Sequence, residues 1–354
     1  MIAMTDPSTA TAPESTLMFR EAAEAGAAVS RMLAANTAAL TALGERLRVT
    51  PPAVVVTCAR GSSDHAATYG KYLIETMTGV PVASAAPSVA SIYAAAPAKG
   101  SIGMLCIAIS QSGRSPDLLA TVATYKAAGA HVVALVNDET SPLAETADTL
   151  IALKAGPEKS VAATKSYIAA LAALSAIVAH WSDDDALTDA VATLPTRLEQ
   201  AWALEWTGMA AMLHDARNLF VIGRGLGYGI AQEAALKLKE TCALHAEAFS
   251  AAEVRHGPMA IVNDGFPVIA FATSDTAGDG VRDAAAEFAA RGAHVALADA
   301  GANGGGDAPA LAAHPAIEPI LMIQSFYRMA NALSLARGLN PDAPQHLSKV
   351  TRTL

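Results

Sequence analysis

The hydrophobic positions change their spacing along the chain in a way that separates helices from strands. Between residues 18 and 47, apolar side chains recur at helical intervals and predict one long helix. Beyond it, short apolar runs alternate with helical stretches, and such runs are typical of strands buried on both faces of a parallel sheet. The predicted strands are 53–58, 104–110, 131–136 and 149–153, and the predicted helices end near residue 76 or span 117–128, 142–146 and 163–181.

A second unit repeats this alternation. Arg60-Gly61 recurs as Arg224-Gly225, 164 residues later, and the pattern Ala-x-Gly-Ala-His-Val at 127–132 recurs at 290–295, 163 residues later. Two matches at nearly one spacing indicate an internal duplication. We therefore predict an α/β protein of two doubly wound units. The predicted strands of the second unit are 218–223, 267–273 and 294–299, with helices after the first strand and over 279–290.

This pattern also suggests where the units begin and end. Residues 1–17 are expected to be a short disordered lead-in, and residues 301–307 a surface loop. The first domain, with its N-terminal helix, is expected over 18–182. A helical linker would follow over 183–215, and the second domain with a C-terminal tail over 216–354.

Composition narrows the possible functions. Of 354 residues, 52% are hydrophobic and 16% are charged, which excludes disorder for most of the chain. No apolar run reaches the roughly 18 residues of a transmembrane helix, and the N-terminus lacks the pattern of a secretory signal. The 24 Lys and Arg residues are outnumbered by 33 Asp and Glu residues, giving a net charge of −9 without basic runs. Neither nucleic acid nor membrane is therefore an expected partner.

Cofactor and metal signals are weak. Cys58, Cys106 and Cys242 are widely spaced and lie in or near apolar segments, so we expect buried free thiols in a reducing cytoplasm and no metal bound through cysteine. The glycines at 223–229 resemble a dinucleotide fingerprint, but Tyr228 stands where its third glycine belongs. A nicotinamide cofactor is not expected.

A serine-rich turn follows the predicted strand 104–110 and is a candidate anion site. Ser110, Gln111, Ser112 and Ser115 surround a predicted helix start, with Ser115 as N-cap and a proline at the first helical position. Free backbone N–H groups and hydroxyls at such a place could hold a phosphate, although an ordinary capped turn would show the same residues. Ser63, at the end of a neighbouring strand, favours the phosphate site.

The second unit carries clustered charges. Glu233, Lys237 and Glu240 share one face of a predicted helix, where a solvated salt-bridge ladder is the plainer interpretation. His256 precedes a Gly-Pro turn that could present its ring to a cleft, and Lys349 lies on a tail that in isolation would be solvated. None of these features is decisive alone.

Together these motifs resemble the sugar-isomerase (SIS) domains of the glucosamine-6-phosphate synthase family. The resemblance rests on SQSG-x-S, E-x-A-L-K-L-K-E, HAEAF-x-x-x-E-x-RHGP and LSKVT, and it covers about residues 18–354. It implies two tandem SIS domains, each an αβα sandwich with a parallel sheet, in a protein that is usually dimeric. The synthase also carries a glutaminase domain, which we do not expect here, so glutamine is not the expected ammonia source.

The resemblance also implies roles for individual residues. Glu240 matches the base that moves a proton between C1 and C2, and His256 matches the histidine that assists ring opening, donated across a dimer interface. Lys349 matches the tail lysine that forms a Schiff base. Ala163 and Arg60 depart from the family, which has Ser and Cys there. The residues expected to bind substrate are Ser63, Ser110, Gln111, Ser112, Ser115, Val161, Lys237 and Ser348.

The expected reaction is the conversion of glucosamine 6-phosphate to fructose 6-phosphate and ammonia, without metal or redox cofactor, as in SIS-type deaminases. Three alternatives stay open. A deglycase or plain aldose–ketose phosphate isomerase would use the same proton shuttle. An ammonia-dependent synthase would run the reaction backwards, and a sugar-phosphate sensor would only bind.

Overall fold

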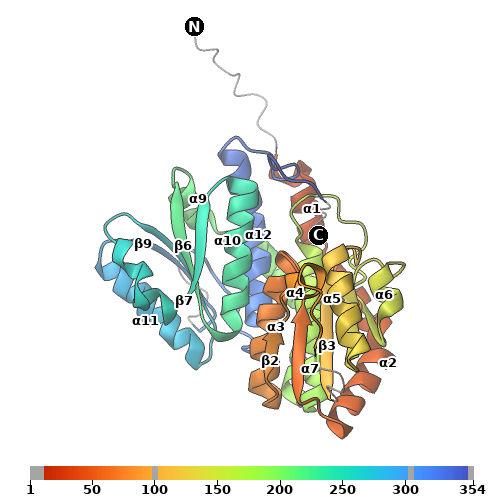
Figure 1. Ribbon diagram of the computed structural model, residues 1–354. Coiled ribbons are helices and arrows are strands. Elements are labelled where there is room, and N and C mark those ends of the chain that lie inside the picture. Colours follow the sequence, from red (N-terminus) through yellow and green to blue (C-terminus); the bar gives the residue numbers. More distant parts are fainter. Residues whose placement is uncertain (1–11, 98–102, 302–306, 350–354) are drawn as a thin grey trace.

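The first parallel sheet forms where the apolar runs predict it. The computed structural model describes residues 12–97, 103–301 and 307–349 (Figure 1). The five strands run parallel in the order β2-β1-β3-β4-β5. The four predicted strands are confirmed, whereas β2 was not predicted, because only Val82 of this short edge strand is buried. The strands are β1 (Val54–Cys58), β2 (Val82–Ser84), β3 (Met104–Ser110), β4 (His131–Val136) and β5 (Thr149–Ala152).

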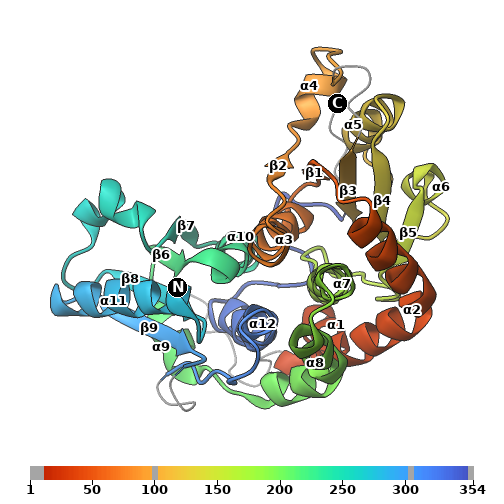
Figure 2. The same cartoon turned by 90° about the horizontal axis from the view of Figure 1, so that it is seen from below.

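Helices cover both faces of this sheet, as Figure 2 shows. Because successive side chains of a strand point to opposite faces, Leu105 and Ile107 of β3 pack on one side while Cys106 and Ala108 pack on the other. The first side carries α2 (Ala25–Val49), α3 (Ser62–Thr78) and the almost wholly buried α7 (Lys165–Ser182). The second side carries α5 (Pro116–Ala127) and α6 (Pro142–Thr146), while α4 (Pro87–Ser91) packs against α5. This is an αβα sandwich.

The second sheet repeats the plan of the first. It comprises β6 (Asn218–Gly223), β7 (His245–Ser250), β8 (Pro267–Ala272) and β9 (His294–Asp299), all parallel in the order β7-β6-β8-β9. The expectation of two tandem α/β units is therefore confirmed. The strand β7 was not predicted, because it is an edge strand whose residues are mostly exposed or half-buried.

The duplicated Arg-Gly pair has a structural cause. Gly61 follows β1 with φ +55° and Gly225 follows β6 with φ +54°, a backbone conformation that glycine adopts without strain. Each turn leads from the first strand of a unit toward its next long helix. These helices are α3 and α10 (Tyr228–Cys242), which lie side by side between the two sheets (Figure 2).

The other helices lie in the expected linker and in the second unit. Residues 183–215, expected to be a helical linker, carry α8 (Asp185–Ala203) and α9 (Thr207–Leu213). The helix α12 (Glu318–Ala336), which was not predicted, is buried on most sides against α10 and α8. The second sheet carries α11 (Thr276–Ala290) on its other face. Within the described ranges, every helix is too short or too polar to traverse a bilayer.

The N-terminal residues that the structure describes pack against the second unit. Residues 1–11 lie outside the described part, but residues 12–17 are ordered, contrary to the expected lead-in. They contain the short turn η2 (Pro13–Ser15), and Thr16 donates a hydrogen bond to Asn331 of α12 at 2.7 Å. The predicted helix 18–47 is two helices, because α1 (Leu17–Ala23) ends before Glu24.

The structure also bears on the predicted cysteines, loop and tail. The three cysteines, Cys58, Cys106 and Cys242, are buried and free, as expected. Of the predicted loop 301–307, residues 302–306 lie outside the described part, as do residues 350–354 of the expected tail.

Candidate active site

The serine-rich turn lies at the carboxyl end of the first sheet, where open α/β folds bind ligands. The Ser110 hydroxyl accepts a hydrogen bond from the Gly113 N–H at 3.0 Å, which closes the turn. Gly113 has φ +64°, and a Cβ there would overlap Ser141, so this position needs glycine. The half-buried Ser112 lies between them with no side-chain hydrogen bond to any described residue.

Ser115 differs in one respect from its expected role. It stands at the N-cap position of α5 with extended backbone, and Pro116 takes the first helical position. Within the described chain, however, the Ser115 side chain does not cap the helix. The hydroxyl is therefore not engaged with the α5 backbone.

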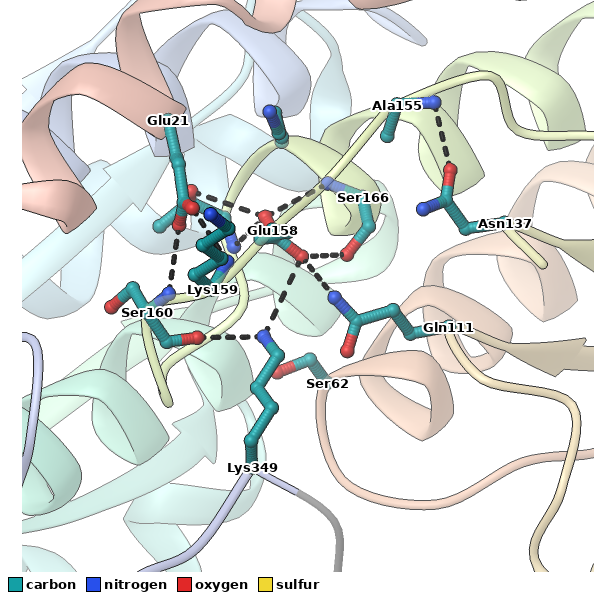
Figure 3. A network of polar contacts seen from close by, with 12 residues as sticks. Glu21, Ser62, Gln111, Asn137, Ala155, Glu158, Lys159, Ser160, Ser166 and Lys349 are labelled. Carbon is teal, nitrogen blue, oxygen red and sulfur yellow. Dashed lines mark hydrogen bonds and ion pairs between the residues drawn. The ribbon is translucent and has the colours of Figure 1, made fainter.

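Gln111 reaches from this turn to a buried carboxylate, Glu158, in the loop after β5. Its Nε2 donates to Glu158 Oε2 at 2.6 Å (Figure 3). The same carboxylate accepts the Thr164 N–H at 2.9 Å and the Ser166 hydroxyl at 2.5 Å. Glu158 thereby ties the serine-rich turn to the start of α7.

The C-terminal tail brings Lys349 to this loop. Its Nζ donates to the Ser160 carbonyl oxygen at 2.6 Å and lies 4.0 Å from Glu158 Oε2 (Figure 3). Glu21 of α1 accepts the N–H groups of Lys159 and Ser160, which holds the loop from the other side. Burial lowers the pKa of Lys349 below 10.5, and the positive charge of Lys237 adds to this.

Farther along the chain, α10 supplies a row of buried charges. Lys237 Nζ lies 2.6 Å from Glu240 Oε2 and 3.3 Å from Glu233 Oε1, and it donates to the Ser62 hydroxyl at 3.1 Å. Lys237 is 1% exposed and Glu233 is wholly buried, whereas the Glu240 side chain is 22% exposed. The solvated ladder considered for these residues is therefore wrong, because the row is enclosed by α3 and α12.

The charges in this row support one another. Burial would lower the pKa of Lys237, but the carboxylates of Glu233 and Glu240 raise it above 10.5. Burial would raise the pKa of Glu233, yet Lys237 and His65 hold it below its ordinary value of 4.5. The pKa of Lys349 responds to both Lys237 and Glu240, which places the tail amine within electrostatic range of this row.

Contacts through Glu158 thus join the tail lysine to the serine-rich turn, while the α10 charges contact Ser62 of α3 and influence the tail lysine electrostatically. The structure does not bring His256 to these groups. That residue is exposed on the turn η4 (Glu253–His256), and its ring has no hydrogen bond or ion pair with any described residue. Val161 is half-buried and donates its N–H to the Asp342 carbonyl oxygen at 3.2 Å, and Ser348 is exposed beside Lys349.

Several residues of this site were not predicted from the sequence. Ser63 was predicted and lies half-buried on the first turn of α3, but the neighbouring Ser62 is the residue that contacts Lys237. Glu158 was not predicted, although a carboxylate in the loop after a predicted strand was a usable signal. His65, whose Nδ1 lies 3.0 Å from Glu233 Oε2, was not predicted either.

Two further features bear on ligands. In the part of the chain that the structure describes, no three His, Cys, Asp or Glu side chains are grouped as they would be around a metal ion. A cavity of about 370 Å³ lies between α2, α7 and α8, and its lining includes Leu33, Thr37 and His180 but none of the site residues above.

Comparisons with known proteins agree with this architecture. The SIS domain family model matches residues 54–180 and 212–302. The glutamine–fructose-6-phosphate aminotransferase (isomerizing) of Zymomonas mobilis is 33% identical over 313 residues, which are 83% of this chain and 51% of that protein. The chain therefore spans about half the length of the curated relatives it matches.

Solved structures extend the likeness. A candidate phosphosugar isomerase from Silicibacter pomeroyi DSS-3 is 42% identical, with a TM-score of 0.85 over 92% of this chain and 100% of the other. The C-terminal domain of glucosamine-fructose-6-phosphate aminotransferase from Francisella tularensis is 26% identical, with a TM-score of 0.80 over 93% and 98%. With both sheets matched by the family model, this chain belongs to the SIS domain family and carries two tandem SIS domains.

Proposed function

We propose that this protein is an amino-sugar-phosphate isomerase and deaminase that converts glucosamine 6-phosphate and water to fructose 6-phosphate and ammonia. The observation that carries the proposal is the placement of two groups near the carboxyl end of the first sheet. Glu240 is a carboxylate held 2.6 Å from a buried ammonium, and Lys349 is an amine whose pKa is lowered. The names of the relatives, which act on amino or keto sugar phosphates, support the same substrate class.

The phosphate of the substrate would bind at the serine-rich turn. A phosphate monoester carries about −1.5 to −2 charges at pH 7 and favours helix N-termini with free hydroxyl and N–H donors. The turn from Ser110 to Ser115 precedes the twelve-residue helix α5, and Ser112 and Ser115 have hydroxyls not used within the described chain. A protein with net charge −9 can hold an anion locally in this way.

Glu240 would then move a proton between two carbons of the open-chain sugar. It removes the proton from C2, which gives an enolamine, and returns a proton to C1, which leaves an imine at C2. Water adds to that imine carbon, and the C–N bond breaks to release ammonia and the ketone. Alternatively, the Lys349 amine adds to the same carbon and ammonia leaves, which forms a Schiff base, and water then hydrolyses this Schiff base to the ketone and the free lysine.

Ring opening requires a further group, and the described residues of a single chain do not bring His256 to the site. We include His256 of a second copy in this role, in a homodimer with shared active sites, because the ring is exposed and unengaged within the described chain. The three buried, unpaired thiols support a reducing, cytoplasmic setting, which we also include.

The direct test is a coupled ammonia assay on the purified protein with glucosamine 6-phosphate. Ammonia and fructose 6-phosphate should form in equal amounts, and Glu240→Gln should abolish both. Glu205→Gln is the matched control, because Glu205 pairs with Arg328 on the surface. Unchanged turnover in Glu240→Gln would refute the assignment.

A substrate panel separates the neighbouring activities. Fructosamine 6-phosphate as the better substrate would indicate a deglycase. Interconversion of nitrogen-free aldose and ketose phosphates would indicate a plain isomerase. Binding without turnover of any panel member would indicate a sensor.

A further inference from the structure

A chain of buried polar contacts joins the first SIS domain to Glu240. His65 of α3 places Nδ1 3.0 Å from Glu233 Oε2 on α10. The other oxygen of Glu233 lies 3.3 Å from Lys237 Nζ, which in turn lies 2.6 Å from Glu240 Oε2. Exposure falls from 19% at His65 to nothing at Glu233 and rises again to 22% at Glu240. This series of contacts therefore begins and ends at partly exposed side chains, and the side chains between them are buried.

One turn of α3 makes two of these contacts. Ser62 accepts from Lys237, and His65, three residues later and on the same helical face, contacts Glu233. Glu233 and Lys237 are themselves four residues apart on α10. The two helix faces thus engage through two adjacent polar contacts, and neither contact can shift without straining the other.

The groups around Glu233 explain why the imidazole matters. Tyr327 of α12 donates its hydroxyl to Glu233 Oε1 at 3.1 Å, and the Tyr167 hydroxyl of α7 lies nearby. Burial keeps the pKa of both tyrosines well above 10, so they are neutral donors at pH 7. Asp64, beside His65, is the other acid on this turn of α3.

The hydrogen-bond direction at Glu233 follows from its charge. An ionised carboxylate only accepts, so the His65 Nδ1 carries the proton in this contact. A donor on Oε2 leaves Oε1 turned toward Lys237. Without that donor, only the contacts of Tyr327 and Lys237 with Oε1 would orient the carboxylate. The carboxylate would be held less firmly beside the buried ammonium, and a poorly compensated charge is costly in a dry environment.

We propose that His65 is a positioning residue for proton transfer: by holding Glu233, it keeps the Lys237 ammonium seated against Glu240. This inference rests on the proposed function, in which Glu240 is the base. It adds that a single imidazole of the first domain, His65, determines how the carboxylate of Glu233 in the second domain is held.

The test compares variants that keep or remove the donor. His65→Leu removes it, and we expect kcat to fall about 10- to 100-fold with KM changed less than about twofold, the effect of one hydrogen bond to a charged group. The acid limb of the kcat profile should move to higher pH, because a less well seated Lys237 stabilises the ionised Glu240 less. His65→Asn, whose side-chain amide lies where Nδ1 was, should restore kcat to within about threefold and return the acid limb.

His214→Leu is the matched control, because its ring contacts Asp215 at 2.8 Å away from the site. It should leave kcat and the pH profile unchanged. Where His65→Leu does not fold, His65→Gln serves instead, since it is polar but places its amide beyond the Nδ1 position, and it should show the same shift in smaller measure.

The proposal is overturned if His65→Leu, or His65→Gln in its place, keeps the kcat and acid limb of the unaltered protein, or if His65→Asn fails to restore them. Its failure is distinct from failure of the proposed function. Loss of activity in Glu240→Gln together with unaltered kinetics in His65→Leu would remove only the positioning role, whereas an active Glu240→Gln would remove the proposed function itself.

Discussion

Gly229 of α10 lies directly against the backbone of His65 in α3. A Cβ at Gly229 would stand 2.7 Å from the His65 carbonyl oxygen and 2.9 Å from the Tyr69 amide nitrogen. Both obstacles are main-chain atoms of another helix, so they cannot move aside as a flexible side chain would. The absence of a side chain at one position therefore sets the spacing across which His65 and Ser62 reach the α10 charges.

Gly229→Ala should destabilise the protein, although alanine favours a helix. The overlap is expected to cost about 1–3 kcal/mol, against a helix-propensity gain of about 0.5–1 kcal/mol. Separating the helices would also lengthen the Lys237–Ser62 contact and lower kcat. Urea unfolding and steady-state kinetics measure the two effects. Gly280→Ala on α11 is the control, because its Cβ meets chiefly the flexible end of Arg224, and its stability should be unchanged or higher.

The buried Glu233–Lys237 pair should shape the dependence of stability on pH. The pKa of Glu233 is lower in the folded than in the unfolded chain, so its contribution is fully present above about 4.5 and is lost as the pH falls through the folded value. The pKa of Lys237 is raised, so its contribution is present below about 10.5 and is lost as the pH rises through its folded value. The pair should therefore stabilise the fold throughout the neutral range.

Glu233→Gln tests this dependence. At pH 7 it should lower the free energy of unfolding by about 3–5 kcal/mol, as expected when one partner of a buried ion pair is removed. The difference from the unaltered protein should shrink below pH 4.5. Glu205→Gln removes an exposed ion pair and should cost at most about 1 kcal/mol. Equal losses of unfolding free energy from the two substitutions at pH 7 would contradict a buried ion pair between Glu233 and Lys237.

Lys349 should react with amine reagents at a lower pH than an ordinary lysine does. Its lowered pKa means that a larger share of the amine is uncharged at any pH below 10.5. Competitive acetylation followed by mass spectrometry should give a lower labelling midpoint for Lys349 than for the exposed Lys71. The midpoint is the informative quantity, since the partial burial of Lys349 slows its rate at every pH. Equal labelling midpoints for Lys349 and Lys71 would contradict a lowered pKa of Lys349.

Asp342 should matter to both stability and turnover. Its carboxylate accepts the Leu17 and Met18 N–H groups at 2.7 and 2.8 Å, at the start of α1. Asp342→Ala should cost about 1 kcal/mol, as the loss of a helix-capping carboxylate does. It should also reduce kcat several-fold, because the same tail carries Lys349. Urea unfolding and the ammonia assay measure the two effects.

Asp184→Ala provides the comparison for Asp342→Ala. Asp184 caps α8 by accepting the Leu187 N–H at 2.7 Å, and it lies outside the tail. Its loss should cost a similar amount of stability with kcat unchanged. If neither substitution changed kcat, the position of Lys349 would not depend on the contact between Asp342 and α1.

The strands that were predicted from the sequence carry apolar runs that are at least half buried. Residues 132–136, for example, are all apolar because helices cover both sides, and this pattern is visible without a structure. The two strands that were missed, β2 and β7, are edge strands that bury little, so their composition resembles that of loops. The other edge strands, β5 and β9, were predicted because they keep more buried apolar residues, so the extent of burial separated the two cases.

The candidate site was predictable in its residue types more than in its contacts. Ser62 and Ser63 are consecutive, and only the rotation of α3 about its axis decides which hydroxyl meets Lys237. Similarly, His65 and Glu233 are 168 residues apart, and neither looks unusual in its own segment. Their partnership arises from the packing of α3 on α10, which local patterns do not specify.

The clasp between Asp342 and the first residues of α1 also affects how the molecule is made. It joins positions 325 residues apart, so it cannot close while the chain is still short. An elongating polypeptide can build both sheets first, yet α1 stays uncapped and Lys349 stays unseated until residues 342–349 have left the ribosomal exit tunnel. Synthesis thereby places the assembly of the candidate site after the formation of both sheets.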